Sequence, residues 1–418
     1  MKIPFLNKKK SKNLDLEEDP VFLALDIGTE YVKSVIYKVE NDTANVIGYS
    51  RIPQHSKAME GAMVINIDNV VSTCDIGIGR ALVVADKVLG SKCPLPDYVT
   101  LGIAGEIVKG VCIVANYERE DPEMQITDEE IQEVVKNIKD QAFSDSVEDI
   151  AEEIGINSKK IKEINSHINS TYIDGIKVDN PIGFTGEEVT YRVYSTFAPS
   201  LHVNSLYEVA KRLELKVLTI DVQPYAISKS YKGAHKSDFS SIFIDIGGGT
   251  TDIAIVQDGG IVGTKMIAFG GRVFTRRLAK DMNLELEKAE KMKLDYSNKK
   301  LQGTTEKKIK KILEDDSRLW AEGIEISLAE FEEVEEFPAE ILISGGGSEL
   351  PEMYDALISY PWLTVLPFGK FPNVKHMYPK QIANINDETG LMHTTHDVVP
   401  AALTSISIKP AKDLLLNK

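Results

Sequence analysis

The feature that most restricts the fold of this chain is a short pattern that occurs twice. An apolar run is followed by an aspartate, a glycine-containing turn, a hydroxyl residue and a second run rich in β-branched residues. The two copies begin at Phe22 and Ile242, and their aspartates are Asp26 and Asp245. Apolar runs of this kind on either side of a glycine turn predict β-hairpins. Two similar lobes, each built around one hairpin, are therefore expected.

Length and composition agree with two lobes and exclude several classes of protein. A chain of 418 residues is too long for one ordinary core. The net charge of −16 argues against nucleic acid as the main partner, because phosphate backbones are bound by clustered Lys and Arg. The three cysteines have no CxxC spacing, which indicates neither a disulfide framework nor a zinc site. With no apolar run near the roughly 18 residues of a membrane helix, a cytoplasmic protein is expected.

The rest of the chain alternates between strand-like and helical segments, which predicts an α/β fold. The helix that starts at Thr127 has a capping pattern, since Glu130 follows three residues later. The predicted segments are a helix over 69–89 broken at Gly77 and Gly79, a strand over 98–104, a helix over 127–142, a strand over 191–197, a helix over 203–213, a strand over 216–221, a largely helical region over 273–337 and a strand over 339–344.

The two glycine turns have the chemistry of a phosphate site. Glycines let successive backbone N–H groups point at one anion. An aspartate beside phosphate requires a hard cation between them, and Mg²⁺ held through water by Asp26 and Asp245 is expected. Lys33, seven residues after Asp26, could neutralise phosphate charge. The predicted phosphate-binding residues are Gly28, Thr29, Lys33, Gly247, Gly248, Gly249, Thr250 and Thr251.

A third glycine-rich segment follows the strand over 339–344. Gly345, Gly346, Gly347 and Ser348 would let the backbone pass close over a flat ring such as adenine. Taken alone, a glycine loop at the end of a core strand is as readily structural. The order of two phosphate turns and then this loop favours a nucleotide site. No GxxxxGK[ST] motif occurs, so the phosphates would not be held by a P-loop.

Two other patterns are interpreted as structural. Asp75 to Gly79 resembles a further glycine turn, but a helical pattern follows it. His393 and His396 are three residues apart, yet no cysteine or carboxylate pattern completes a zinc site around them.

With the three glycine motifs in this order, the chain resembles the actin superfamily, in which nucleotide lies between two RNase-H-like lobes. It resembles the FtsA cell-division family more closely, and the resemblance covers most of residues 20–405. The segments that carry it are 59–68 (MEGAMVINID), 174–186 (DGIKVDNPIGFTG), 245–255 (DIGGGTTDIAI), 269–275 and 344–351 (SGGGSELP).

The resemblance implies an actin-like fold with a small inserted domain, called 1C or SHS2-like. The implied division is a disordered arm over 1–19, the first lobe (1A) over 20–101 and 191–220, domain 1C over 102–190, the second lobe (2A) over 221–272 and 338–392, a helical subdomain (2B) over 273–337, and a connecting helix and tail over 393–418.

The resemblance also implies site residues. Glu290 and Lys293 match a Glu and a Lys that approach the ribose, although residues so spaced also form ordinary helix ion pairs. Gln223 matches a residue that positions water, and its amide could only orient that water. ATP hydrolysis, if any, is therefore expected to be slow.

The implied role is an ATP-binding protein that polymerises and links the FtsZ ring to the membrane or to other divisome proteins, at the cytoplasmic face of the division site. The FtsZ C-terminal peptide would bind the 2B subdomain, where a basic group could attract it. These side chains could instead pair with nearby glutamates. The basic group is Arg272, Arg276, Arg277, Lys307, Lys308, Lys310 and Lys311.

The end of the sequence departs from the family. FtsA proteins end in an amphipathic membrane helix, whereas residues 409–418 offer only three leucines. Direct membrane attachment through this tail is not expected. A PilM-like ATPase of type IV pilus assembly, with the same fold and a 1C domain, is the nearest alternative. A sugar or acid kinase would need a catalytic aspartate that is not evident.

Overall fold

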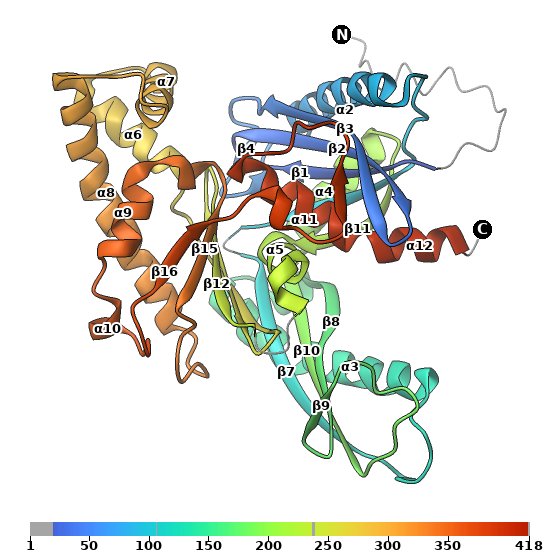
Figure 1. The fold of residues 1–418 in the computed structure, drawn as a ribbon. Coiled ribbons are helices and arrows are strands. Elements are labelled where there is room, and N and C mark those ends of the chain that lie inside the picture. The colour runs from blue at the N-terminus through green and yellow to red at the C-terminus, as the bar shows by residue number, and fades with distance from the viewer. Residues whose placement is uncertain (1–19, 106, 236–238, 417–418) are drawn as a thin grey trace.

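The structure is a computed structural model that describes residues 20–105, 107–235 and 239–416, so the predicted arm over 1–19 lies outside the described residues. Two lobes lie side by side, and a smaller unit projects from them (Figure 1). Two large clusters of buried apolar side chains form the core: one lies in the second lobe, and the other fills the first lobe and extends to residues of the second-lobe sheet such as Phe243 and Leu342. The predicted α/β fold with two similar lobes is confirmed.

The first lobe contains a six-stranded sheet in the order β11-β6-β1-β2-β3-β17. The hairpin of β1 and β2 and the following β3 are antiparallel, whereas β6 runs parallel to β1. Every residue of β1 is buried, as expected for a strand covered on both faces. The strands are β1 (Phe22–Ile27), β2 (Tyr31–Glu40), β3 (Thr43–Pro53), β6 (Tyr98–Ile103), β11 (Lys216–Val222) and β17 (Ile385–Asp387).

The second lobe repeats this arrangement in a five-stranded sheet, with the order β14-β13-β12-β15-β16. Three consecutive antiparallel strands are again followed by a parallel strand beside the first of them. Asp26 and Asp245 therefore occupy the same place, near the end of the first strand of each hairpin. The strands are β12 (Ser241–Ile246), β13 (Thr251–Gln257), β14 (Gly260–Ile267), β15 (Glu340–Ser344) and β16 (Asn373–His376).

The projecting unit is a four-stranded sheet in the order β7-β10-β8-β9, with one long helix, α3 (Asp128–Ile154). The cap at Thr127 is present, because its side chain accepts a bond from the backbone of Glu130. The helix continues twelve residues past the predicted end at 142 and stops at Gly155 in the left-handed conformation. The strands are β7 (Lys109–Glu118), β8 (Ile161–Ile173), β9 (Ile176–Val178) and β10 (Glu188–Pro199).

Helices α5 and α11 pack against each other, and α5 contacts the second-lobe sheet while α11 contacts the first-lobe sheet. The predicted helical region forms α6 to α8 on the far side of the second lobe (Figure 1). A two-stranded ribbon of β4 (Met59–Glu60) and β5 (Met63–Val64) precedes α2. The helices are α2 (Ile67–Leu89), α4 (Ser200–Arg212), α5 (Gln223–Ser230), α6 (Gly271–Met282), α7 (Leu286–Ser297), α8 (Thr304–Ala329), α9 (Pro351–Ser359), α10 (Trp362–Val365), α11 (Val398–Ile406) and α12 (Ile408–Leu416).

The predicted break of the helix at Gly77 and Gly79 is wrong, because α2 is continuous. A Cβ atom at Gly77 would lie 2.8 Å from the Ser34 hydroxyl oxygen of β2. This glycine therefore lets the helix lie close to the sheet, which is a packing role that sequence spacing cannot distinguish from a helix break.

Three segments lie elsewhere than the sequence suggests. Residues 191–199 belong to β10 of the projecting sheet, although 191–220 were expected in the first lobe. β17 pairs with β3 in the first-lobe sheet, although residues 338–392 were expected in the second lobe. The tail is helical as α12, and its Ile408 and Ala411 are buried against the first-lobe core. None of the helices within the described ranges is long and apolar enough to cross a bilayer.

Candidate functional site

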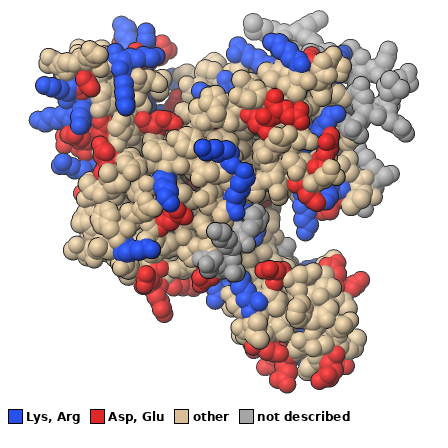
Figure 2. All heavy atoms as spheres, in the orientation of Figure 1, with Lys and Arg blue, Asp and Glu red and all other residues tan. Residues whose placement is uncertain are grey.

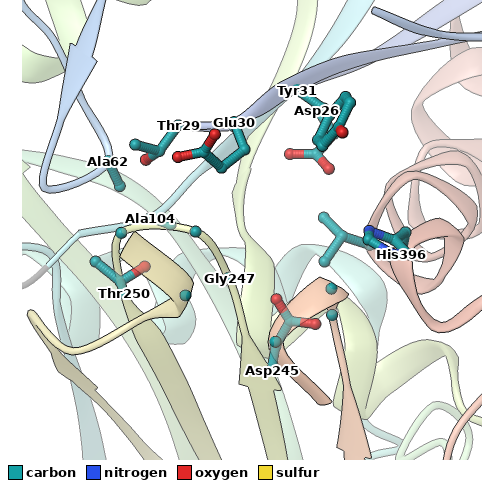
Figure 3. A pocket seen from close by; sticks show the side chains of 18 of the residues that line it. Asp26, Thr29, Glu30, Tyr31, Ala62, Ala104, Asp245, Gly247, Thr250 and His396 are labelled. Atoms are coloured by element: carbon teal, nitrogen blue, oxygen red, sulfur yellow. The ribbon is translucent and has the colours of Figure 1, made fainter. Parts of the chain in front are cut away.

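A cavity of about 470 Å³ lies between the two lobes, and both hairpin turns line it. In Figure 3, Asp26 and Thr29 face Asp245, Gly247 and Thr250 across this space. The turns approach closely, since a Cβ atom on Gly249 would lie 3.0 Å from the Thr29 hydroxyl oxygen. Glycine is required where two backbones meet in this way.

The structure brings nearly all of the predicted site residues to this one cavity. Its wall includes Asp26, Gly28, Thr29, Lys33, Gln223, Asp245, Gly247, Gly248, Gly249, Thr250, Glu290, Lys293, Gly345, Gly346 and Gly347.

Two predicted residues, Thr251 and Ser348, do not line the cavity. Thr251 begins β13, and its side chain faces the opposite way from that of Thr250, because successive side chains alternate along a strand. Its hydroxyl donates to the backbone oxygen of Phe269 and accepts from the Trp320 indole in the second-lobe core. The Ser348 hydroxyl is buried and donates to the backbone oxygen of Gly345, so it stabilises the glycine turn itself.

The Asp26 carboxylate is already fully engaged by two neighbours. Lys33 Nζ lies 2.6 Å from Asp26 Oδ2, and Gln223 Nε2 donates to Asp26 Oδ1 over 3.1 Å. The lysine neutralises the aspartate, and it lines the cavity with donors left over, since an ammonium has three. Gln223 likewise joins the start of α5 to the end of β1.

Asp245 and Asp252 form a second acidic group in the cavity wall. Burial raises the pKa of Asp245 to about 6. Burial and the neighbouring Asp245 carboxylate raise the pKa of Asp252 well above its usual value. Asp252 Oδ1 is buried and has no hydrogen-bond partner within the described residues. Two adjacent buried carboxyls with an unsatisfied oxygen fit a cation better than Asp26 does.

The described residues contain no group of three or more His, Cys, Asp or Glu arranged to hold a metal directly. A magnesium ion here would therefore keep water and phosphate oxygens as most of its ligands, as Mg²⁺ commonly does. Asp245 and Asp252 would hold that ion, and Ser344 orients Asp245 by donating to its Oδ1 over 2.6 Å.

Glu290 and Lys293 of α7 line the cavity and also bond to each other. Lys293 Nζ lies 2.8 Å from Glu290 Oε2, and it donates to the backbone oxygen of Gly271 and to the Thr275 hydroxyl. Glu290 and Lys293 therefore form a helix ion pair and also lie beside the cavity.

The third glycine turn directly follows β15 and lines the cavity. Gly345 has φ of 81°, and a Cβ atom there would lie 2.5 Å from the backbone oxygen of Ile246. A Cβ atom on Gly346 would lie 2.4 Å from His396 Cε1. Only glycine allows the backbone to pass so close to both neighbours.

A bridge between the lobes was not predicted. The Arg272 guanidinium, at the start of α6, donates to the Glu30 carboxylate of the first lobe. It also donates to the backbone oxygens of Thr29 and Met59 over 2.9 and 3.3 Å. We call this set the Arg272 bridge. It links the glycine turn of the first lobe to the start of α6 in the second lobe.

The sequence offered a signal for only one of the residues that were missed. Asp252 is the last residue of the DIGGGTTD segment and could have been found there. Tyr31, Arg51 and His396 also line the cavity, but they come from β2, β3 and the turn before α11. Nothing in their local sequence marks them as neighbours.

Comparison with known proteins agrees with this geometry. The family model described as Cell division protein FtsA matches residues 242–388. The Cell division protein FtsA of Neisseria meningitidis serogroup B is 30% identical over 275 residues, which are 65% of this chain and 60% of that protein. The predicted resemblance to FtsA is confirmed. The FtsA of Bacillus subtilis is 24% identical over 355 residues, or 80% of this chain and 72% of that FtsA.

A solved structure supports the fold. The PilM–PilN type IV pilus biogenesis complex contains a chain that matches with a TM-score of 0.62 at 16% identity. The match covers 94% of this chain and 99% of that chain. The predicted actin-like fold is thereby confirmed. The sequence identity to this chain is lower than the identity to the FtsA proteins.

Proposed function

We propose that this chain binds ATP with Mg²⁺ in the cavity between its lobes and acts as an actin-like protein of cell division. The observation that carries the proposal is the convergence of all three glycine turns on one cavity whose wall holds two buried, adjacent carboxyls. The turns would hold phosphates and the sugar–base part of the ligand. Mg²⁺ would neutralise phosphate charge beside Asp245 and Asp252.

Hydrolysis of the bound ATP would be slow. Gln223 donates to Asp26 and is held in place, so its amide can orient a water molecule but cannot take a proton from it. Two of the carboxyls in the described wall of the cavity, Asp245 and Asp252, favour the protonated form more than ordinary aspartates do.

Calorimetry with Mg-ATP and Mg-ADP tests the proposal. Asp245→Ala should weaken Mg-ATP binding by about tenfold or more, because it removes a charge that holds the cation. Glu340→Gln is the matched control, since Glu340 pairs with Lys375 at the surface of the same lobe. Equal affinities of the parent chain and Asp245→Ala for Mg-ATP would refute the proposed cation site.

The partners are also part of the proposal: self-association into filaments, other division proteins, and the C-terminal peptide of FtsZ on α6 to α8, all at the cytoplasmic face of the membrane. Figure 2 shows Lys and Arg side chains over this helical region, with acidic side chains among them. Arg272 is committed to the bridge, and Arg277 and Lys310 pair with carboxylates of their own helices. The exposed residues that remain for an acidic peptide are Arg276, Lys307, Lys308 and Lys311.

A PilM-like role in pilus assembly is the second candidate, favoured by the fold match over nearly the whole chain. A titration of the chain with an FtsZ C-terminal peptide and with a PilN peptide separates the two. Binding of the PilN peptide alone would favour the pilus role.

A further inference from the structure

One end of the cavity is lined by three polar side chains that have no polar partner among the residues that the structure describes. They are Tyr31 at the start of β2, Arg51 of β3, and His396 in the turn before α11. Throughout residues 20–105, 107–235 and 239–416, no hydrogen bond or ion pair is formed by the Arg51 guanidinium, the Tyr31 hydroxyl or the His396 ring nitrogens. Polar groups left open beside a cavity are available to a ligand.

The three side chains are nevertheless held in a fixed arrangement. Arg51 Cζ lies 5.4 Å from the centroid of the Tyr31 ring, which is a cation–π contact. The His396 ring stands nearly perpendicular to Tyr31, at 82° and with 6.4 Å between the ring centroids. Tyr31 therefore lies between the arginine and the histidine. Figure 3 shows Tyr31 and His396 on the same side of the cavity as Asp26.

The backbone around His396 is arranged to place the ring there. The backbone oxygen of Thr395 accepts from the Gly345 N–H over 3.1 Å, and the Thr395 hydroxyl donates to the Gly345 oxygen over 3.0 Å. Gly346 has no side chain, which leaves the space that the imidazole fills. The third glycine turn and the histidine are thus fitted to each other.

Basic and acidic side chains both lie near this end of the cavity. The carboxylates here are engaged by other described groups, unlike the Arg51 guanidinium: Asp26 pairs with Lys33, Glu349 accepts from the Thr395 hydroxyl, and Asp397 accepts from Tyr49, from the Thr394 hydroxyl and from backbone N–H groups. Burial, together with Lys33 and Arg51, lowers the pKa of His396 to about 4, against the opposing effect of Asp397. The imidazole is therefore neutral at pH 7 and can donate one hydrogen bond beside an unpaired guanidinium.

We propose that Arg51, Tyr31 and His396 form a binding site for a phosphate group at this end of the cavity. A guanidinium can hold two oxygens of a tetrahedral oxyanion, and a phenol hydroxyl and an imidazole N–H supply further donors. The phosphate is either the terminal phosphate of bound ATP or free inorganic phosphate. In the first case the proposal rests on the proposed function. The chemistry is the same for both sources.

Calorimetric titrations of the whole chain distinguish the sources. The parent chain, Arg51→Gln and His396→Gln are titrated with Mg-ATP, with Mg-ADP, and with inorganic phosphate in the presence of saturating Mg-ADP. If the site takes the terminal phosphate, both variants should weaken Mg-ATP binding by about tenfold and leave Mg-ADP binding within about twofold. If it takes free phosphate, only phosphate binding should weaken by about tenfold.

Arg192→Gln is the matched control. Arg192 also stacks on a tyrosine, with its Cζ 5.5 Å from the Tyr172 ring centroid, but it lies in the projecting unit outside the cavity. The proposal is overturned if Arg51→Gln and His396→Gln leave all three affinities unchanged, or if Arg192→Gln changes them equally.

A failure of the proposed function gives a different result. If neither nucleotide binds the parent chain, that function is refuted. A titration of the ligand-free chain with inorganic phosphate then tests the phosphate site by itself. Binding that is lost in Arg51→Gln would support the site. Binding that is absent, or independent of Arg51, would overturn it.

Discussion

The buried carboxyl of Asp245 makes the stability of the ligand-free chain depend on pH. Its folded-state pKa of about 6 lies above the ordinary value of 3.8, so ionisation of this group disfavours the folded state. The penalty is absent below pH 3.8, develops between pH 3.8 and 6, and is complete above pH 6. Asp245→Asn should therefore raise the free energy of unfolding at pH 7.5 by about 3 kcal/mol.

Urea denaturation in EDTA at pH 4 and pH 7.5 measures this difference. The gain should shrink at pH 4, where the parent carboxyl is largely protonated. Asp42→Asn, which changes an exposed aspartate paired with Lys412, should show no comparable gain. An asparagine variant that is less stable than the parent at pH 7.5 would contradict the argument.

Individual residues of the site were predictable where the signal is local. The glycines and aspartates of the turns are marked by their spacing, because hairpin geometry is set by a few consecutive residues. The orientation of Thr251 depends on which residue starts β13, and a shift of one residue turns the side chain to the other face. Arg51 and His396 meet only through tertiary packing, which their local sequence does not encode.

At the scale of elements, the Arg272 bridge should hold the first turn of each lobe in place. Arg272→Ala removes donors to Glu30 and to two backbone oxygens, so the amides of 28–30 and 247–250 should exchange hydrogen faster in the ligand-free chain. Hydrogen-exchange mass spectrometry measures this. Arg277→Ala is the control, because Arg277 lies on the same helix and pairs with Asp281.

Unchanged exchange in Arg272→Ala would mean that the glycine turns are held by their own contacts alone. The existence of α6 could be predicted from sequence, whereas the bridge could not. An arginine at a helix start has no preferred partner until the two lobes are placed side by side. The same reason explains why the continuous α2 was missed, since the contact of Gly77 with β2 is also non-local.

At the scale of the whole molecule, the projecting unit is joined to the second lobe as well as to the first. Asn169 of β8 donates to the Ile261 backbone oxygen over 2.6 Å and accepts from its N–H over 2.8 Å. The Tyr194 hydroxyl of β10 also lies 2.7 Å from the Thr264 hydroxyl. Asn169→Ala should therefore speed exchange of the Ile261 amide and of the rest of β14.

Asn116→Ala is the control for that experiment, since Asn116 bonds to Thr190 within the projecting unit. If β14 exchanges equally in both variants, the unit does not restrain the second lobe. We could not predict from the sequence the order of strands in each sheet or these contacts between units. Parallel pairings such as β1 with β6 join segments that are distant in the chain. The α/β class and the repeated hairpin were predictable from local patterns alone.

Because β17 pairs with β3, the two lobes obtain all of their segments at different stages of translation. Residues 241–376 supply every strand of the second-lobe sheet, so that sheet can form as soon as this stretch has left the ribosome. The first-lobe core instead includes Val398, Leu403 and Ala411, which follow that stretch along the chain. The strands of the first-lobe sheet between residues 22 and 103 therefore precede the second lobe along the chain, whereas the helices that complete their core follow it, so this core can close only after the second lobe has been translated.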